Sequence, residues 1–408
     1  MTKASKEGQR KAPILRFKGF TDAWEQRQLK EVADIVGGGT PSTDFSEYWN
    51  GNINWFTPNE INSQIYFSES KRKISNLGLK KSSAKLLPAN RSILFTSRAT
   101  IGEMGILTQD ATTNQGFQSL VLHNEVIPYF IFSMKSALKR QAIKKASGST
   151  FLEISKREVE KLKIIIPSEK EQKKVSMLFK SIDNLITLYE RKVKLLLQIK
   201  KYLLNNLFSE KEYPDLRFKY SKKDNWKKIS LSSVLTYKNG KAHEKEINNK
   251  GNLDLVMMNS ITTEGRLITK KKIFSPQDTL SKNDIVIVLS DIAKGELIGK
   301  SSVIPCDDQY VLNQRIGCLR PTSNIDSFFV SKYINQKSQY FKSHAAGTSQ
   351  INLSKSDVLN CTIYIPNIDE QHYVSNFIIN IEKNINFYKD KKQCFIEIKN
   401  TLLNNMFI

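Results

Sequence analysis

The feature that most constrains the fold of this chain is an internal duplication with a period of about 200 residues. The string PILRFK at 13–18 returns as PDLRFK at 214–219, and LLNN at 203–206 returns at 402–405. From Asn114 onward, matching residues lie 199 positions apart. Solenoid repeats have units of roughly 20 to 50 residues, so this period is too long for a solenoid. The 408-residue chain is therefore predicted to be a duplicated two-part unit with several domains.

Each copy divides into a mixed α/β segment and a helical segment. In the α/β segment, short β-like runs such as 93–96 and 163–166 alternate with Gly, Pro and Asn turns. Both copies end this segment with an apolar run before a proline, at Pro167 and at Pro366. The predicted divisions are a basic N-terminal tail at 1–12, a first globular domain at 13–167 with a helix at 168–210, and a second globular domain at 211–366 with a helix at 367–408.

The start of each predicted helix has the spacing of a capping box. Ser168 is followed by Glu171, and Asn367 by Glu370, so the first side chain of each pair can accept a hydrogen bond from a first-turn amide. Neither helical segment contains Gly or Pro for roughly forty residues, which at ~1.5 Å per residue predicts a helix about 60 Å long.

Apolar residues recur every seven positions along both predicted helices, which is the pattern of a coiled coil. The predicted seam consists of Val175, Ile182, Tyr189, Leu196 and Leu203 in the first helix and of Val374, Ile381, Tyr388, Phe395 and Leu402 in the second. Two helices of identical register in one chain can bury each other, and an antiparallel pair is the simplest arrangement with pseudo-twofold symmetry. Pairing only with helices of other subunits is the alternative.

The chain is strongly basic, with 63 Lys and Arg against 40 Asp and Glu and a net charge of +23. Such an excess favours a polyanionic partner, although a compositional bias of the genome toward lysine would produce the same numbers. Hydrophobic residues make up 39% of the chain, which is enough for folded cores and excludes a disordered basic tail.

Several other classes of protein are disfavoured by what the sequence lacks. The N-terminus is polar and basic with no apolar stretch behind it, and the longest aliphatic run, 285–289, is far too short to span a membrane. The cysteines form no CxxC pair and the histidines are isolated, so we expect neither a disulfide framework nor a zinc site. These features predict a cytoplasmic protein with no membrane partner.

The sequence also lacks the motifs of an enzyme that acts on DNA. An adenine methyltransferase holds its flipped base with an Asn/Asp-Pro-Pro-aromatic motif, and no such tetrapeptide is present. The segment Gly295–Ser301 resembles a phosphate-binding loop but is one residue too short. We therefore expect no catalytic residue, no metal site and no cofactor on this chain.

An ordered series of short motifs runs through the first globular domain. The motifs are GGTPS at 38–42, YWNG at 48–51, INWFT at 53–57, SSAKLLP at 82–88, RATIG at 98–102 and TNQGF at 113–117. This series closely resembles the target recognition domains of the specificity (S) subunit of Type I restriction–modification systems, and the tandem order of domain and helix matches over nearly the whole chain. The resemblance implies an α+β protein with two α/β target recognition domains in tandem, each followed by a long α-helix, and with the two helices forming an antiparallel coiled coil.

The resemblance also implies a function and a set of partners. The chain would be the non-catalytic DNA sequence-specificity subunit of a Type I restriction–modification complex, whose helices set the gap between two half-sites and dock methyltransferase subunits. Its partners would be double-stranded DNA, two methyltransferase (M) subunits and restriction/translocase (R) subunits. S-adenosylmethionine, ATP and Mg²⁺ would be bound by the partner subunits only. An autonomous DNA-binding regulator without enzymatic partners and a pure coiled-coil scaffold are the alternatives.

The second globular domain departs from the motif series. It lacks the GGTP and YWNG strings, and Asn239–Lys241 and Asn259–Ile261 stand where they would fall. It keeps Asn313 and Gln314 and the turn at 347–349. Divergence confined to the globular domains, with matched helices, predicts that each domain recognises one half of an asymmetric, bipartite DNA target.

Polar side chains in the motif loops are the candidate DNA contacts, because Asn, Gln, Arg, Ser and Thr can recognise base edges while Lys and Arg contact phosphates. The candidates are Thr40, Ser42, Asn59, Arg98, Thr100, Asn114, Gln115 and Ser149 in the first domain, and Lys241, Asn259, Ser260, Asp291, Asn313, Gln314, Arg315 and Thr348 in the second. For Asn114 and Gln115, which recur in both copies, a turn-stabilising role is favoured over contact with adenine. Ser149 and Thr348 either bind phosphate or cap a turn, and Asp291 either accepts a hydrogen bond from cytosine or caps a turn.

Two further features have structural explanations. The predicted helix Phe130–Lys145 has a basic face, and we favour an amphipathic packing helix over contact with the DNA backbone. Trp24, Trp55 and Trp226 are predicted to be core residues rather than platforms on which bases stack.

Overall fold

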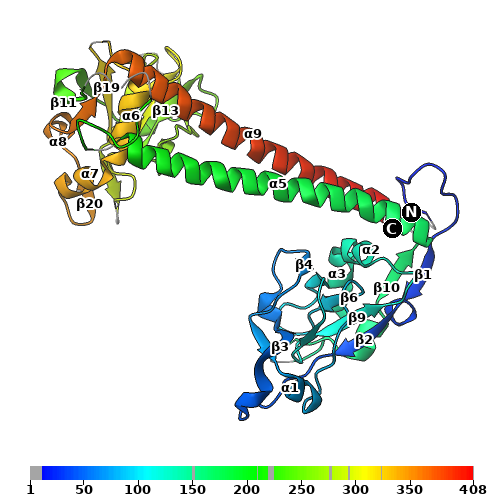
Figure 1. Ribbon diagram of the computed structural model, residues 1–408. Coiled ribbons are helices and arrows are strands. Elements are labelled where there is room, and N and C mark those ends of the chain that lie inside the picture. The colour runs from blue at the N-terminus through cyan, green and yellow to red at the C-terminus, as the bar shows by residue number, and fades with distance from the viewer. Residues whose placement is uncertain are drawn as a thin grey trace. The chain divides into compact units, whose positions relative to one another are not determined.

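The computed structural model describes residues 12–148, 152–208, 210–218, 225–274, 278–292, 295–322 and 324–407. The chain forms two compact units: unit 1 consists of Met1–Tyr189 and Asp390–Ile408, and unit 2 of Glu190–Lys389. Two 39-residue helices, α5 (Glu169–Leu207) and α9 (Ile368–Met406), contribute to both units (Figure 1). The predicted long helices are thus confirmed, whereas the compact units divide each helix rather than ending where it begins.

The globular part of unit 1 contains two sheets and a two-stranded ribbon (Figure 1). The five-stranded sheet has the order β2 (Ala33–Gly37), β9 (Gln118–Leu122), β6 (Ser92–Phe95), β7 (Met104–Leu107) and β4 (Tyr66–Phe67). The three-stranded sheet has the order β5 (Arg72–Ile74), β3 (Trp49–Phe56) and β8 (Ala111–Thr113), and the ribbon pairs β1 (Glu25–Gln28) with β10 (Lys163–Ile166). The short helices are α1 (Asn76–Lys80), α2 (Pro128–Ser133), α3 (Lys135–Lys145) and α4 (Lys156–Glu160).

The globular part of unit 2 repeats this topology although its loop motifs have diverged. Its larger sheet has the order β12 (Leu235–Asn239), β19 (Ile316–Pro321), β15 (Ile285–Val288) and β17 (Ser301–Val303). Its smaller sheet has the order β14 (Lys272–Ile273), β13 (Leu253–Val256) and β18 (Tyr310–Leu312). Two ribbons pair β11 (Lys227–Ser230) with β21 (Thr362–Ile365) and β16 (Ser290–Ile292) with β20 (Gln350–Asn352), and the short helices are α6 (Ser327–Gln336), α7 (Ser338–His344) and α8 (Lys355–Leu359).

Each unit closes its main core with residues of the long helices. In unit 1, Val175 and Phe179 of α5 and Met406 of α9 belong to the same buried cluster as Trp24. In unit 2, Leu203 of α5 and several α9 residues belong to the cluster around Trp226. The exposed fractions of Trp24, Trp55 and Trp226 are 4%, 4% and 1%, which confirms that the three tryptophans are core residues.

A buried arginine–glutamate pair joins each globular part to the start of its long helix. In unit 1, Arg16 donates to both carboxylate oxygens of Glu171 at 2.7 Å, and in unit 2 Arg217 donates to those of Glu370 at 3.0 and 2.6 Å. Both glutamates have side chains only 1% exposed. Bidentate pairs of this kind are short, strong and directional.

The predicted capping boxes are only partly correct. The amide of Glu370 donates to Asn367 Oδ1 at 3.0 Å, so Asn367 caps α9 as predicted. At the start of α5, however, the amide of Glu171 donates to the backbone carbonyl of Ser168, not to its side chain. Both glutamates use their carboxylates for the arginine pairs described above instead of for a box. A pattern within four residues could not reveal a partner about 150 positions away.

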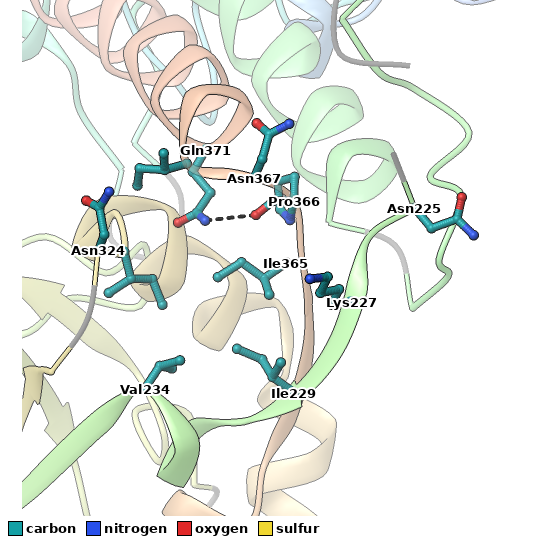
Figure 2. A pocket seen from close by; sticks show the side chains of 11 residues that line it. Asn225, Lys227, Ile229, Val234, Asn324, Ile365, Pro366, Asn367 and Gln371 are labelled. Carbon is teal, nitrogen blue, oxygen red and sulfur yellow. Dashed lines mark hydrogen bonds between the residues drawn. The ribbon is translucent and has the colours of Figure 1, made fainter. Parts of the chain in front are cut away.

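A neighbouring glutamine makes the same two contacts at each of these junctions. Gln371 donates from Nε2 to the carbonyl oxygen of Pro366 at 3.0 Å (Figure 2), and its Oε1 accepts from the amide of Asp326 at 2.9 Å. Gln172 does the same with Pro167 and Ile127, both at 3.0 Å. Glu171-Gln172 and Glu370-Gln371, which lie 199 positions apart, therefore mark the two points where a domain is fixed to its helix.

The long helices pack against each other in both units, and in each unit the pairing is antiparallel. In unit 1 the rings of Tyr189 and Phe395 stack with centroids 5.7 Å apart, and in unit 2 Lys192 Nζ lies 4.9 Å from the ring centroid of Tyr388. All ten predicted seam residues are buried or half-buried. The antiparallel coiled coil within one chain is therefore confirmed.

A carboxylate and a lysine face each other between the helices at equivalent positions of the repeat. In unit 1, Lys399 of α9 donates to both oxygens of Asp183 of α5, at 2.6 and 2.9 Å. In unit 2 the roles of the helices are exchanged, with Lys200 of α5 lying 2.6 Å from Glu382 of α9. Asp183 and Glu382 are 199 positions apart, as are Lys200 and Lys399.

Each of these carboxylates also holds a helix of the adjacent globular part. Tyr129 of α2 donates its hydroxyl to Asp183 at 2.6 Å, and Lys332 of α6 donates to Glu382 at 2.9 Å. Burial and the Asp183 carboxylate raise the pKa of Tyr129 well above its ordinary value, so this hydroxyl stays a donor. In each unit, one carboxylate of a long helix thus contacts both the other long helix and the globular domain.

The predicted helix Phe130–Lys145 is wrong in one respect, because it is interrupted at Met134 between α2 and α3. The Ser133 hydroxyl donates to the backbone carbonyl of Tyr129 at 2.8 Å, a local bond that competes with continued helix. Lys135 and Lys139 both pair with Glu103, at 2.5 and 2.6 Å. Much of the basic face is therefore neutralised within the domain, in line with the favoured packing role.

We expect Lys399→Met to lower the free energy of unfolding by about 2–3 kcal/mol, because Asp183 would keep a buried charge without its cation. Urea denaturation followed by circular dichroism measures the change. Lys170→Met, which removes an exposed lysine of α5, is the matched control and should change stability by no more than about 0.5 kcal/mol. Equal effects of the two substitutions would contradict the interpretation.

A second prediction concerns the stability of the fold at low pH. Burial acts to raise the pKa of the Glu382 carboxyl, but Lys332 and Lys200 together lower it below the ordinary value of 4.5. A depressed pKa stabilises the fold fully above about pH 4.5, and this contribution is lost as the pH falls through the lowered pKa. The melting temperature of Glu382→Gln should therefore lie below that of the wild type at pH 7, and the difference should shrink between pH 5 and pH 3. A difference that stays constant over this range would rule the explanation out.

Candidate nucleic-acid interface

Four loops of unit 1 that carry predicted contact residues are joined by backbone hydrogen bonds. The amide of Gly39 donates to Thr113 at 2.8 Å, that of Asn114 to Phe56 at 3.0 Å, and that of Ser97 to Gly116 at 2.8 Å. The loops follow β2, β3, β6 and β8, so the ends of two sheets meet here. We call residues 38–42, 57–60, 97–102 and 113–117 the recognition loops of unit 1.

The close approach of two of these loops explains the glycine that begins the first motif. A Cβ atom on Gly38 would lie 1.9 Å from the carbonyl oxygen of Asn114. Unit 2 has the same contact, since a Cβ on Gly240 would lie 1.9 Å from the carbonyl oxygen of Asn313. Any larger residue would therefore push the loops apart in either unit.

Most of the predicted contact residues of unit 1 lie in these loops with exposed polar groups. Ser42, Asn59, Arg98 and Thr100 are exposed, and Thr40 is half-buried. The Thr40 hydroxyl donates to Gln115 Oε1 at 2.6 Å, while the Arg98 guanidinium lies 2.8 Å from Glu153. The Arg98 side chain is still 53% exposed, so it can reach a ligand.

Asn114 and Gln115 differ in their placement. The Asn114 side-chain oxygen accepts a hydrogen bond from the amide of Gly116 at 2.9 Å, which holds the turn. Gln115 is exposed and belongs to the surface of the loops. The turn-stabilising role favoured for the pair therefore fits Asn114 better than Gln115. Ser149 lies outside the described residues.

Unit 2 builds the same scaffold with different side chains. The amide of Asn313 donates to Val256 at 3.0 Å and that of Leu289 to Arg315 at 2.9 Å, which are the bonds made in unit 1 by Asn114 and Ser97. Arg98 of unit 1 bridges to Glu153, and its counterpart Ser290 pairs with Asn352 between β16 and β20. We call residues 240–243, 257–260, 289–292 and 313–315 the recognition loops of unit 2.

Three predicted contact residues of unit 2 are buried and hold the loops together. Ser260, Asp291 and Asn313 are 2%, 5% and 2% exposed. Asp291 accepts from the amides of Ile292 and Leu297 at 2.8 and 2.7 Å, and Ser260 accepts from the amide of Met257 at 3.0 Å. Asn313 accepts from the amide of His243 at 3.0 Å. For Asp291, this placement favours the capping role over a hydrogen bond to cytosine. Buried in this way, Ser260, Asp291 and Asn313 hold the loops in place and are not available to contact DNA.

The remaining predicted residues of unit 2 are at the surface or near it. Asn259, Arg315 and Thr348 are exposed, and Gln314 is half-buried and donates to Glu244 at 2.7 Å. Lys241 lies 2.7 Å from Asp278, and its side chain is 70% exposed. Hydrogen bonds from Lys241 and Lys238 lower the pKa of Asp278 to about 2, so this carboxylate stays charged between them.

An arginine that no sequence pattern predicts lies beside the recognition loops of unit 1. The exposed guanidinium of Arg72 lies 3.8 Å from the ring centroid of Trp49 and 5.5 Å from that of Trp55. The Trp49 indole in turn donates to the carbonyl oxygen of Ser42 at 3.0 Å. The tryptophans belong to the motif series, but nothing local marks Arg72 as their partner.

Several other possibilities for a site have little support in the described part of the chain. It contains no group of three or more His, Cys, Asp or Glu residues placed to hold a metal ion, and no helix that is both long and apolar enough to cross a membrane. The amides of Gly299 and Ser301 donate to Val288 and to Asn335, so the segment that resembled a phosphate loop does not offer its backbone to a ligand.

A cavity of about 750 Å³ lies beside the start of α9 in unit 2 (Figure 2). It is lined by Asn225, Lys227, Ile229, Val234, Asn324, Ile325, Ile365, Pro366, Asn367, Ile368 and Gln371. The lining is a mixture of apolar and amide side chains with a single charged group, and Gln371 is already used to join the domain to the helix. We place no site there.

The comparison with known proteins gives one family. The family described as "Type I restriction modification DNA specificity domain" matches residues 21–198 and 223–395. The MjaIX specificity subunit of Methanocaldococcus jannaschii is 31% identical over 236 residues, which is 55% of this chain and 54% of the relative. The match thus spans about half the length of that relative. The MjaVIII specificity subunit of the same organism is 24% identical over 93% of this chain and 91% of the relative.

Solved structures show the same fold at low sequence identity. The S subunit of a Type I restriction–modification system from M. genitalium has a TM-score of 0.62 and 15% identity, over 97% of this chain and 99% of that one. A chain from a study of complex assembly in the type I R-M system has a TM-score of 0.53 and 16% identity, over 94% and 97%.

We expect Arg315→Gly to raise the free energy of unfolding by roughly 0.5–1 kcal/mol. Arg315 has a φ of +70°, in the left-handed region that costs a non-glycine residue about 1–2 kcal/mol. Relief of this strain should exceed the entropic cost of a more flexible residue. Urea denaturation measures the change, with Asn283→Gly as a control because asparagine tolerates its φ of +69° better. A clear loss of stability would show that the arginine is not strained.

Proposed function

This chain belongs to the family of Type I restriction–modification DNA specificity subunits, and we propose that its two sets of recognition loops bind the two halves of an asymmetric, bipartite DNA target. The observation that carries the proposal is that both units make two matching backbone hydrogen bonds at these loops, by Asn114 and Ser97 in unit 1 and by Asn313 and Leu289 in unit 2, while presenting different side chains. A common scaffold with unlike contact residues is what two unlike half-sites require.

The exposed polar residues of the loops supply the proposed contacts. In unit 1 they are Ser42, Asn59, Arg98, Thr100 and Gln115 with the half-buried Thr40, and in unit 2 Lys241, Asn259 and Arg315 with the half-buried Gln314. The exposed Thr348, in the turn at 347–349 outside these loops, is added to the proposed contacts of unit 2. Arginine can donate two hydrogen bonds to guanine, and Asn or Gln can do so with adenine, whereas lysine suits a phosphate. The net charge of +23 supplies the general attraction to DNA.

The long helices are the proposed docking surface for methyltransferase subunits, and their length sets the gap between half-sites. Large apolar side chains on these helices stay exposed beside the buried seam. On α5 they include Met177, Leu188, Leu195, Leu197 and Tyr202, and on α9 Tyr373, Phe377 and Phe387. Exposed apolar groups in such number favour a subunit that has partners over an autonomous regulator.

The chain itself is proposed to be non-catalytic. Methylation and cleavage would be carried out by methyltransferase and restriction/translocase subunits, which would bind S-adenosylmethionine, ATP and Mg²⁺. The family of the chain supports this division of labour. We propose that the chain contributes target choice and geometry, and that it works in the cytoplasm, where the cellular DNA is.

We expect substitutions in the two sets of loops to alter different halves of the target. Arg98→Ala should relax base preference in one half-site by about 1–3 kcal/mol, roughly ten- to a hundredfold, and Arg315→Ala should do so in the other. Single-molecule methylome mapping of cells that carry each variant with its partner subunits is the measurement. Lys282→Ala, outside the loops, is the control. One palindromic motif, or changes in both halves from one substitution, would refute the assignment.

We expect the double substitution Leu195→Glu and Leu197→Glu to weaken association with the methyltransferase at least tenfold, because both exposed leucines lie on the proposed docking surface. Co-purification with a co-expressed methyltransferase subunit measures this, and the circular dichroism spectrum and melting temperature of the variant check that it is folded. Lys194→Glu, a charge change at an exposed position of the same turn, is the matched control. Undiminished co-purification of the double variant would remove α5 from the docking surface.

A further inference from the structure

A second cavity of unit 2 lies between α5 and the C-terminal end of α6. Its volume is about 480 Å³. The residues that line it are Leu197, Lys200, Lys201, Leu204, Asn205, Thr263, Glu264, Lys300, Lys332, Asn335, Gln336 and Ser338. Four of them are lysines and one is a carboxylate, so the cavity is strongly cationic.

The lysines of this cavity are incompletely neutralised. Lys200 and Lys332, whose side chains are 11% and 8% exposed, share the single carboxylate of Glu382. Lys300 donates to the backbone carbonyl of Asn335 at 3.4 Å and forms no ion pair with the described residues. Burial, reinforced by the charge of Lys342 and opposed by that of Glu264, lowers the pKa of Lys300. Holding these cations together therefore costs free energy that a bound anion would recover.

The corresponding region of unit 1 carries less positive charge. The third group at the helix junction is neutral Tyr129 in unit 1 and a second lysine, Lys332, in unit 2. The strand register places Ser301 of β17 where Met104 of β7 lies, so Lys300 stands in the position of Glu103. Glu103 pairs with two lysines of its own unit. The cationic cavity is thus a feature of unit 2 that the common fold does not require.

We propose that this cavity binds a phosphoryl group between Lys300, Lys332 and Lys200. Three lysines from three different elements surround the space, and their ammonium groups can each donate to a different oxygen of one phosphate. The phosphate can come from the backbone of a DNA duplex or from a free anion, and the experiment below separates these sources. The proposal does not depend on which bases the recognition loops contact.

The test compares Lys300→Met with Lys282→Met in the full chain. Lys282 is an exposed lysine that precedes β15 and does not line the cavity. Its substitution by methionine therefore removes the same charge at a different place. In the first arm, pyrophosphate should raise the melting temperature of the wild type and of Lys282→Met relative to NaCl at the same ionic strength, but not that of Lys300→Met. In the second arm, Lys300→Met should weaken binding to a non-specific duplex five- to tenfold more than Lys282→Met.

Either arm succeeding supports the site and identifies the source of the phosphate. If neither pyrophosphate nor duplex distinguishes the two variants, the proposal is wrong, even if an acidic protein is later found to bind there. Lys300→Met should fold because it removes a cation that the folded state disfavours. Lys300→Glu introduces the residue type that Glu103 has at the equivalent position of unit 1. This second variant should also fail to bind the anion. Unaltered base preference in the methylome would separate this site from the recognition loops.

Discussion

The structure depends on one interaction that occurs twice, a buried or half-buried carboxylate on one long helix facing a lysine on the other. Asp183 with Lys399 and Glu382 with Lys200 are equivalent under the repeat, so each unit contains one pair. The apolar seam supplies most of the free energy of helix pairing, but seams with a seven-residue period tolerate a shift by one heptad. A shifted register would leave each of these carboxylates without its lysine, at a cost comparable to that expected for Lys399→Met, so the two pairs select one alignment.

Two further contacts, one in each unit, attach the globular domain to the start of its long helix. Arg16 with Glu171, and Arg217 with Glu370, fix the first turn of each helix to its domain, and the adjacent glutamines repeat the attachment. Because these contacts lie at the helix starts, the recognition loops are free to vary. This division explains why the duplication is easy to detect in the helices and nearly absent from the loops of the second domain.

The sequence predicted the parts of the fold whose signals are local or periodic. The seven-residue spacing predicts the paired helices and their seam, and pseudo-twofold symmetry predicts their antiparallel direction. The motif series, together with the tandem order of domain and helix, indicates the family. The partners of Arg16 and Arg72 were missed because they are far away in sequence and no pattern links them. Position in a loop predicts that Ser260 contacts DNA and that Asp291 either does so or caps a turn, but the burial of both side chains depends on tertiary packing that composition does not reveal.

The register of the two helices is the claim on which this account rests, and a disulfide tests it directly. In a chain with Cys394→Ser, cysteines at positions 189 and 395 replace two stacked rings whose centroids are 5.7 Å apart. The account predicts that Tyr189→Cys with Phe395→Cys forms an intramolecular disulfide on mild oxidation, while Tyr189→Cys with Leu402→Cys, in which the second cysteine lies one heptad further along α9, does not. Efficient crosslinking of the second pair, or of neither, would contradict it.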